Sequence, residues 1–165
     1  MNSPTTVTGQ LSAPPQAKFG LVVTRWNQLV VNPLEAGAID TLLQHGVTAD
    51  QITRVQVPGA FEIPLVLDKL AAQGRYAALI ALGAVIRGDT PHFDYVAGEC
   101  VSGISQTMRR YGLPVSFGVL TVDSLEQAMD RAGGKAGNKG SEAAACAIEM
   151  VNLLRQIDLA DTSSS

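Results

Sequence analysis

Residues 76–86 read YAALIALGAVI, and this stretch decides the fold. Its aliphatic side chains follow one another without alternating with polar ones, which is typical of a strand buried on both faces of a parallel sheet. The run carries no charge, but it is much shorter than the ~20 residues that a membrane-spanning helix needs. We therefore interpret it as a central strand of an α/β domain and expect no membrane span.

Three further apolar runs, at residues 18–23, 52–57 and 115–121, predict the other strands. Segments with helical spacing of apolar residues separate the runs and follow the last one. Strands that alternate with helices form parallel sheets covered on both faces. The sequence therefore predicts one doubly wound α/β domain, with a four-stranded parallel sheet and flavodoxin-like layering. The expected helices cover residues 33–45, 63–73, 94–111, a short segment capped at Asp123 or Ser124 and ending at Arg131, and residues 141–157.

Local signals set the expected boundaries. Asn32 followed by Pro33 is typical of an N-cap with proline at the first helical position, and Gly46 is typical of a helix end. Residues 1–17, rich in Pro, Thr, Ser and Gly, predict a flexible or extended arm. Residues 18–158 form the expected domain, and residues 159–165 an expected disordered tail.

The composition excludes several classes of protein. Charged residues make up 16% of the 165 residues, against roughly 25% in an average soluble protein, and apolar residues make up 46%. Disordered chains have the opposite balance. The net charge is -3 and no basic run exceeds Arg109-Arg110, so we expect no nucleic-acid partner. The low charge indicates that part of the surface is buried in a homo-oligomer.

The two cysteines, Cys100 and Cys146, indicate neither a disulfide scaffold nor a metal site. Both lie in segments with helical spacing, so we expect two small buried side chains. There is no CxxC pair and no Cys/His cluster in the sequence. The first residues lack the charged and apolar segments of a secretory signal. We therefore expect a cytoplasmic, reduced protein.

Aromatic residues follow two of the predicted strands directly. In open parallel sheets, ligands bind beyond the carboxyl ends of the strands. Trp26 follows the first strand and Phe61 the second, in a chain whose aromatic content is only 5%. Exposed rings at this edge could stack on a flat heterocycle. The alternative is that both rings plug the end of the sheet.

His92 follows the central strand, after the turn Gly88-Asp89-Thr90. An imidazole there can exchange a proton near neutral pH, although a single histidine can also be an ordinary surface residue. The turn offers backbone N–H groups and a hydroxyl at a helix start, which is one way to hold a phosphate.

The segment 131–140, RAGGKAGNKG, combines three cations with four glycines. It lacks the spacing of a Walker A loop, and no GxGxxG follows any predicted strand, so dinucleotide binding has no support. A cationic, glycine-rich loop can hold phosphate by charge. It can also be a solvated flexible loop.

Four motifs in order are together specific: Trp26-Asn27, VPGAFEIP at residues 57–64, GAVIRGDTPHFDYV at residues 83–96, and the segment 131–140. In this combination the chain resembles the lumazine synthase family of riboflavin biosynthesis, over residues 19–157. Trp26 stands where phenylalanine is frequent in that family, which preserves stacking. Asp89 stands where glutamate or alanine is frequent, so any contact there is expected through its backbone.

The resemblance implies the condensation of 5-amino-6-(D-ribitylamino)uracil with 3,4-dihydroxy-2-butanone 4-phosphate. The product is 6,7-dimethyl-8-ribityllumazine, released with phosphate and water, and no cofactor or metal is implied. His92 matches the catalytic proton-transfer residue. The residues implied for the pyrimidine substrate are Trp26, Asn27, Ala60, Phe61, Glu62, Ala84, Val85, Ile86, Phe117 and Lys139, and those for the phosphate substrate are Gly88, Asp89, Thr90 and Arg131.

The resemblance also implies homopentamers with active sites at subunit interfaces. Phe117, Arg131 and Lys139 would then reach the site from a neighbouring subunit. The segment 131–140 has no insertion, as in members whose pentamers form icosahedral shells. The alternative function is a non-catalytic flavin- or pteridine-binding, or shell-forming, protein of the same fold.

Overall fold

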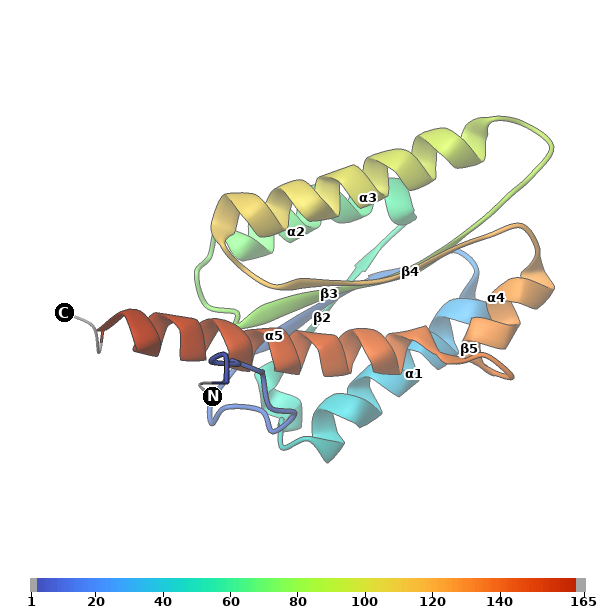
Figure 1. The fold of residues 1–165 in the computed structure, drawn as a ribbon. Helices are drawn as coiled ribbons and strands as arrows, with labels where there is room; N and C mark the ends of the chain where they lie inside the picture. The colour runs from blue at the N-terminus through green and yellow to red at the C-terminus, as the bar shows by residue number, and fades with distance from the viewer. Residues whose placement is uncertain (1–2, 163–165) are drawn as a thin grey trace.

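The computed structural model describes residues 3–162, and the central strand organises it (Figure 1). Strand β3 (Ala78–Ile86) lies between β1 (Phe19–Thr24) and β4 (Val115–Val122), and β2 (Ile52–Val57) pairs with the other edge of β1. All three pairings are parallel. The predicted four-stranded parallel sheet and its doubly wound class are confirmed.

Helices cover both faces of this sheet. Helix α2 (Ile63–Ala71) and helix α3 (His92–Tyr111) lie on one face, while α1 (Gln28–Gln44), α4 (Leu125–Arg131) and α5 (Lys139–Thr162) lie on the other (Figure 1). Short 3₁₀ turns, η1 (Ala49–Gln51) and η2 (Ala60–Glu62), flank β2. The glycine-rich segment is a small hairpin of β5 (Ala132–Gly134) and β6 (Gly137–Asn138). None of the helices within residues 3–162 is long and apolar enough to cross a membrane.

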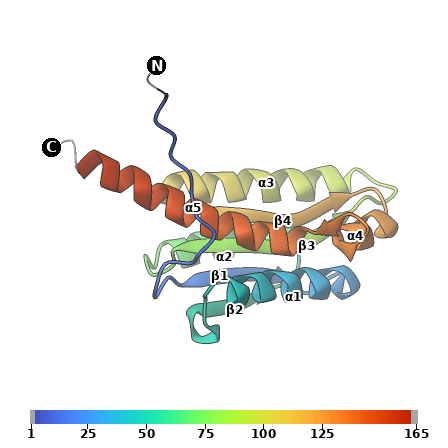
Figure 2. The same ribbon diagram turned by 60° about the horizontal axis from the view of Figure 1, so that its bottom comes forward.

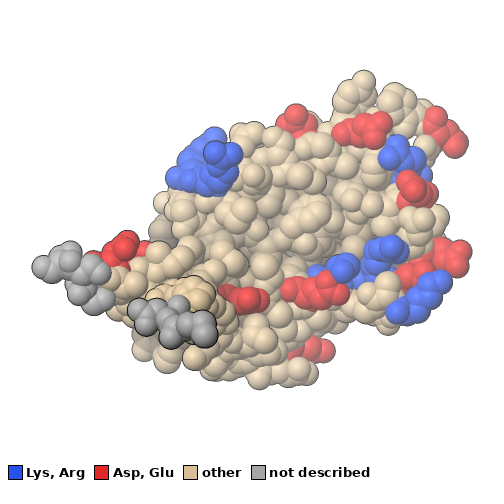
Figure 3. Space-filling view, viewed as in Figure 1, with Lys and Arg blue, Asp and Glu red and all other residues tan. Residues whose placement is uncertain are grey.

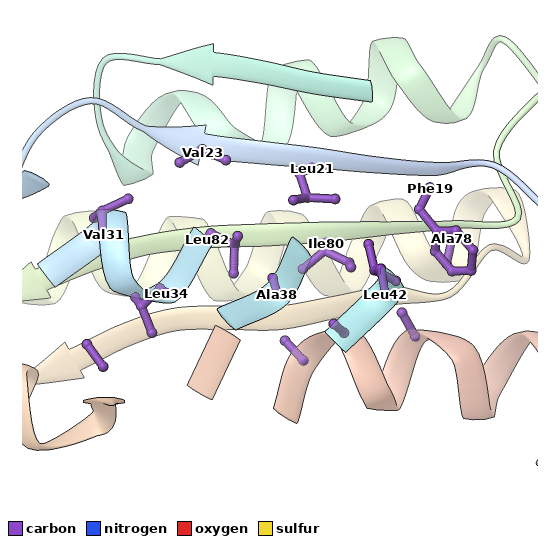
Figure 4. Packing of buried hydrophobic residues seen from close by; sticks show 14 of the residues in the cluster. Phe19, Leu21, Val23, Val31, Leu34, Ala38, Leu42, Ala78, Ile80 and Leu82 are labelled. Atoms are coloured by element: carbon purple, nitrogen blue, oxygen red, sulfur yellow. The ribbon is translucent and has the colours of Figure 1, made fainter. Parts of the chain in front are cut away.

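Alternation along β1 divides the core between the two faces. Phe19, Leu21 and Val23 point towards α1, where Leu34 and other apolar residues meet them (Figure 4). Val22 belongs to the second core cluster, on the side of α2 and α3. Burial on both faces explains why β1 and β3 read as unbroken apolar runs, whereas the edge strand β2 is only partly buried and carries Arg54 and Gln56.

The predicted start of α1 is wrong. The helix begins at Gln28, and Pro33 lies inside it. Asn27 adopts a left-handed backbone (φ 61°, ψ 43°), which asparagine tolerates better than most residues, and its carbonyl accepts hydrogen bonds from the N–H groups of Val30 and Val31. The chain thus turns from strand to helix earlier than the Asn32-Pro33 signal indicates. Gly46, with φ 96°, follows the end of the helix as predicted.

Three other expectations need correction. Helix α5 begins at Lys139 rather than residue 141. It also continues through residues 159–162, which the sequence assigned to a disordered tail, whereas residues 163–165 lie outside the described residues. Cys146 is exposed on α5, and only Cys100 is buried. Burial raises the pKa of the Cys100 thiol to about 11.

The N-terminal arm is extended and tied to the domain. The Asn152 side chain donates to the carbonyl oxygens of Gln10 (2.6 Å) and Ser12 (2.8 Å), and the Ala13 N–H donates to the His45 carbonyl (2.9 Å). The arm therefore crosses α5 (Figure 2). The expected boundary near residue 17 separates the arm from β1.

Helices α1 and α5 approach closely where α5 begins. Asn138 donates to the Pro33 carbonyl (2.9 Å), and its side-chain oxygen accepts from the N–H groups of Gly140 (2.8 Å) and Ser141 (3.1 Å). One side chain thus caps α5 and joins it to α1. At Gly140 the two backbones are so close that a Cβ would lie 1.9 Å from the Leu34 carbonyl oxygen.

Gly140→Ala should therefore lower the free energy of unfolding by about 3 kcal/mol, at the upper end of overpacking costs, because backbone must move to make room. Denaturant unfolding at matched protein concentration measures this. Gly98→Ala is the control, because open space surrounds Gly98 within α3. It should raise stability by about 0.5–1 kcal/mol. Equal stability of Gly140→Ala and the unaltered protein would contradict the close approach.

Candidate functional site

A pocket of about 510 Å³ opens at the carboxyl ends of β1, β2 and β3. Its walls come from the ends of β1 and β3, the turn after β2 and the start of α3. This is the edge at which doubly wound proteins bind ligands. Of the residues singled out from the sequence, it gathers Trp26, Asn27, Ala60, Phe61, Glu62, Ala84, Val85, Ile86, Gly88, Thr90 and His92.

The two aromatic rings are exposed at this pocket. Trp26 is 58% exposed and Phe61 59% exposed. Rings this exposed do not plug the end of the sheet. Trp26 rests on the backbone of Gly59, where a Cβ would lie 2.5 Å from the indole Cε3. The pocket therefore presents a flat indole on a rigid support.

Glu62 and Asn27 shape the wall between the rings and β3. Glu62 accepts a hydrogen bond from the Gly59 N–H (3.0 Å), which closes the turn after β2. The Asn27 side chain donates to the Ala84 carbonyl (3.2 Å) and so ties the turn after β1 to the end of β3. Both polar residues thus position the pocket walls as well as lining them.

The end of β3 extends beyond its pairing with β1 at the pocket. The pairing of β1 with β3 stops at Val23 and Leu82, whereas β3 continues to Ile86. The Ala84 carbonyl faces the side of Asn27, and the Arg87 N–H faces β4, where it donates to Val122 (2.9 Å). Along a strand, the backbone N–H and C=O of successive residues point to opposite sides. The N–H and C=O of Ile86 therefore point to the same side as those of Ala84. A ligand with donors and acceptors on one edge can bind to them.

The turn after β3 leads directly into α3. His92 is the first residue of the helix, is exposed and lines the pocket. Its N–H makes a long contact of 3.5 Å with the Thr90 hydroxyl oxygen. A hydroxyl, backbone N–H groups and an imidazole therefore meet where a helix dipole favours an anion.

Four residues singled out from the sequence do not line this pocket: Asp89, Phe117, Arg131 and Lys139. Phe117 is 46% exposed on the edge strand β4. Arg131 donates to the Gln127 carbonyl (3.0 Å), and Lys139 pairs with Glu142 (2.6 Å). Helix α4 and the hairpin lie at the same end of the sheet as the start of α3 (Figure 1).

Five lining residues were missed as site residues: Thr24, Gly59, Phe93, Tyr95 and Val96. Tyr95 and Val96 stand three and four positions after His92, so helical spacing could have found them. Thr24 is the last residue of a buried strand, and nothing in the sequence distinguishes it. Its buried hydroxyl has no hydrogen-bond partner among residues 3–162.

The described part of the chain holds no group of three His, Cys, Asp or Glu side chains able to bind a metal ion. The fold and the pocket define a doubly wound α/β protein with a pocket at the carboxyl edge of its sheet, where proteins of this class bind small molecules.

Residues 16–155 match the family model of 6,7-dimethyl-8-ribityllumazine synthase, and the chain belongs to this family. The resemblance seen in the sequence motifs is thereby confirmed. The family is one of transferase-type enzymes of riboflavin biosynthesis.

Gly59→Ala should displace the indole of Trp26, because the new Cβ would overlap the ring. Trp26 is the only tryptophan, so the change should appear directly in the intrinsic emission spectrum. The free energy of unfolding should fall by less than about 1.5 kcal/mol, since an exposed side chain can move. Gly88→Ala, also at the pocket but in open space, is the control and should leave the spectrum unchanged. Identical spectra for Gly59→Ala and the unaltered protein would contradict the contact.

Proposed function

We propose that this protein condenses 5-amino-6-(D-ribitylamino)uracil with 3,4-dihydroxy-2-butanone 4-phosphate to give 6,7-dimethyl-8-ribityllumazine, phosphate and water. The observation that carries the proposal is that three of the four family motifs line a single pocket. Those motifs are far apart in the sequence, and the fold alone brings them together.

The pocket walls suit the two substrates. The pyrimidine stacks on Trp26, with Phe61 beside it, and its polar edge binds the backbone of β3 at Ala84 and Ile86, beyond the pairing with β1. Ala60, Glu62, Asn27 and Val85 complete this part of the site. The phosphate lies at the start of α3, against the Thr90 hydroxyl and the backbone of Gly88 and Asp89.

Proton transfer is the main catalytic contribution that this reaction needs from the protein. The amine of the pyrimidine attacks the ketone carbon and water leaves as the imine forms. Phosphate is then eliminated, and attack of the ribityl-substituted amine on the carbonyl carbon that results closes the ring with loss of a second water. No step transfers electrons to or from a partner, so the reaction requires no redox cofactor. His92 exchanges the protons, and holding two substrates together removes much of the entropic barrier.

A neighbouring copy of the chain would complete the site. Three residues implied for the site do not line the pocket of their own chain: Phe117, Arg131 and Lys139. Phe117 is exposed on the edge strand β4, where a second copy of the chain can contact it. The middle of the face in Figure 3, where β4 lies between α3 and α5 in Figure 1, shows no charged side chain. These features support contact with a second copy of the chain, in which Arg131 of one subunit holds the phosphate bound to the next. The pentamer, its assembly into an icosahedral shell and the cytoplasmic location are proposed from the resemblance to the family. Sedimentation and electron microscopy test the assembly.

The deciding experiment mixes the purified protein with both substrates and follows the absorbance and fluorescence of the lumazine. Product formation no faster than the uncatalysed reaction would refute the proposal. A parallel titration with riboflavin tests the alternative of a non-catalytic flavin- or pteridine-binding protein. That alternative predicts binding without turnover.

His92→Ala should slow turnover by no more than about 100-fold, at the low end of general acid–base effects, because the condensation is chemically easy. Steady-state kinetics at saturating substrate measure this. His45→Ala is the matched control, because His45 contacts the Thr41 carbonyl far from the pocket. A His92→Ala protein that fails to fold would contradict an exposed proton-transfer role.

Arg131→Ala should raise the KM for the phosphate substrate by about tenfold or more, the effect of losing one charge-assisted hydrogen bond. The KM for the pyrimidine should change much less. Lys135→Ala, in the hairpin that follows Arg131, is the control, because Lys135 is highly exposed and pairs with Asp130. Equal changes in both KM values would argue against a phosphate clamp.

A further inference from the structure

Arg87 joins three elements at the edge of the pocket without lining it. Its N–H continues the pairing of β3 with β4 by donating to the Val122 carbonyl. Its guanidinium donates to Asp123 (Nε to Oδ1, 3.0 Å) and to Asp94 (Nη1 to Oδ1, 3.4 Å). One side chain therefore connects the ends of β3 and β4 with the first turn of α3.

The pair of Arg87 and Asp94 closes a loop. Residues 88–93 lie between them, and this loop holds Gly88, Thr90 and His92 of the pocket. The loop's own side-chain tether, from the His92 N–H to Thr90, is long at 3.5 Å. The Arg87–Asp94 bond at the base of the loop is of similar length, 3.4 Å, and the shorter bond of Arg87, 3.0 Å, is the one to Asp123. Arg87 is therefore anchored at Asp123 and adds a second tether to the loop.

Phe93 links this connection to the pocket wall. The guanidinium carbon of Arg87 lies 4.2 Å from the centre of the Phe93 ring, within cation–π range. Phe93 lines both the pocket and the shallow groove that contains Arg87, Asp94 and Asp123. The ring is therefore a partition between the two, and Arg87 supports it from the side of the groove.

We propose that Arg87 is a positioning residue: its bonds to Asp94 and Asp123 hold the loop 88–93 in the shape that places His92 and the Thr90 turn at the pocket. The catalytic consequence rests on the proposed function, whereas the effect on the loop does not. Both ion pairs are exposed, and exposed pairs contribute little to global stability. Their effect should therefore be local to the loop.

The test compares Arg87→Met and Arg87→Lys with the control Arg54→Met. The control removes an ion pair on the opposite edge of the sheet, between half-exposed Arg54 and Glu35, whose side chain is 13% exposed. Amide hydrogen exchange of residues 88–94 should accelerate by about tenfold or more in Arg87→Met, and less in Arg87→Lys. It should not change in Arg54→Met. Melting temperatures within a few degrees of each other are expected in all three.

In the same proteins, kcat/KM should fall by about tenfold in Arg87→Met, with partial recovery in Arg87→Lys. Unchanged exchange at residues 88–94 overturns the proposal, and so does faster exchange with unchanged activity. If Arg87→Met does not fold, Asp123→Asn is used instead, because it weakens the bond between Arg87 and Asp123. The same hydrogen exchange and kcat/KM measurements then decide the proposal. Absence of activity in the unaltered protein refutes the proposed function instead, and the exchange result still decides whether Arg87 holds the loop.

Discussion

Burial of β3 is the constraint on which the rest of the structure depends. Residues 78–85 are buried on both faces, so the strand needs β1 and β4 beside it and helices above and below. β3 also runs past the last residue that pairs with β1, Leu82. The pocket forms at this overhang, where backbone polar groups meet the rings of Trp26 and Phe61. The position of the site is therefore a result of unequal strand lengths.

The sequence predicted the strands well because their signal is local and strong. Apolar runs predicted the bounds of β1, β3 and β4 to within two residues, and segment 52–57, which also contains polar residues, predicted β2 at its observed bounds. The predicted start of α1 was wrong because the chain turns at Asn27, whose side chain donates a hydrogen bond to the carbonyl of Ala84. Ala84 is distant in the sequence, so no local pattern indicates this bond. The start of α5 depends likewise on Asn138 reaching Pro33. The motifs identified most of the pocket, but no sequence pattern indicated that Arg87 meets both Asp94 and Asp123.

Two glycines fix distances that side chains could not. At Gly59 the missing Cβ lets the indole of Trp26 lie on the backbone, and at Gly140 it lets α5 begin against the Leu34 carbonyl. The first contact sets one wall of the pocket. The contact at Gly140 sets the position of the hairpin and of Arg131 relative to α1. The site and the proposed subunit contact thus depend on backbone proximity as much as on the chemistry of side chains.

The anchoring of the arm to Asn152 has a practical consequence. Helix α5 begins at the pocket end of the sheet and runs to the opposite end, and the arm crosses it at Gln10 and Ser12, far along its length (Figure 2). The chain therefore enters and leaves the domain away from the pocket. A peptide tag joined through residues 3–12 or through the last turns of α5 would therefore extend from the end of the sheet opposite the pocket mouth and leave that mouth open.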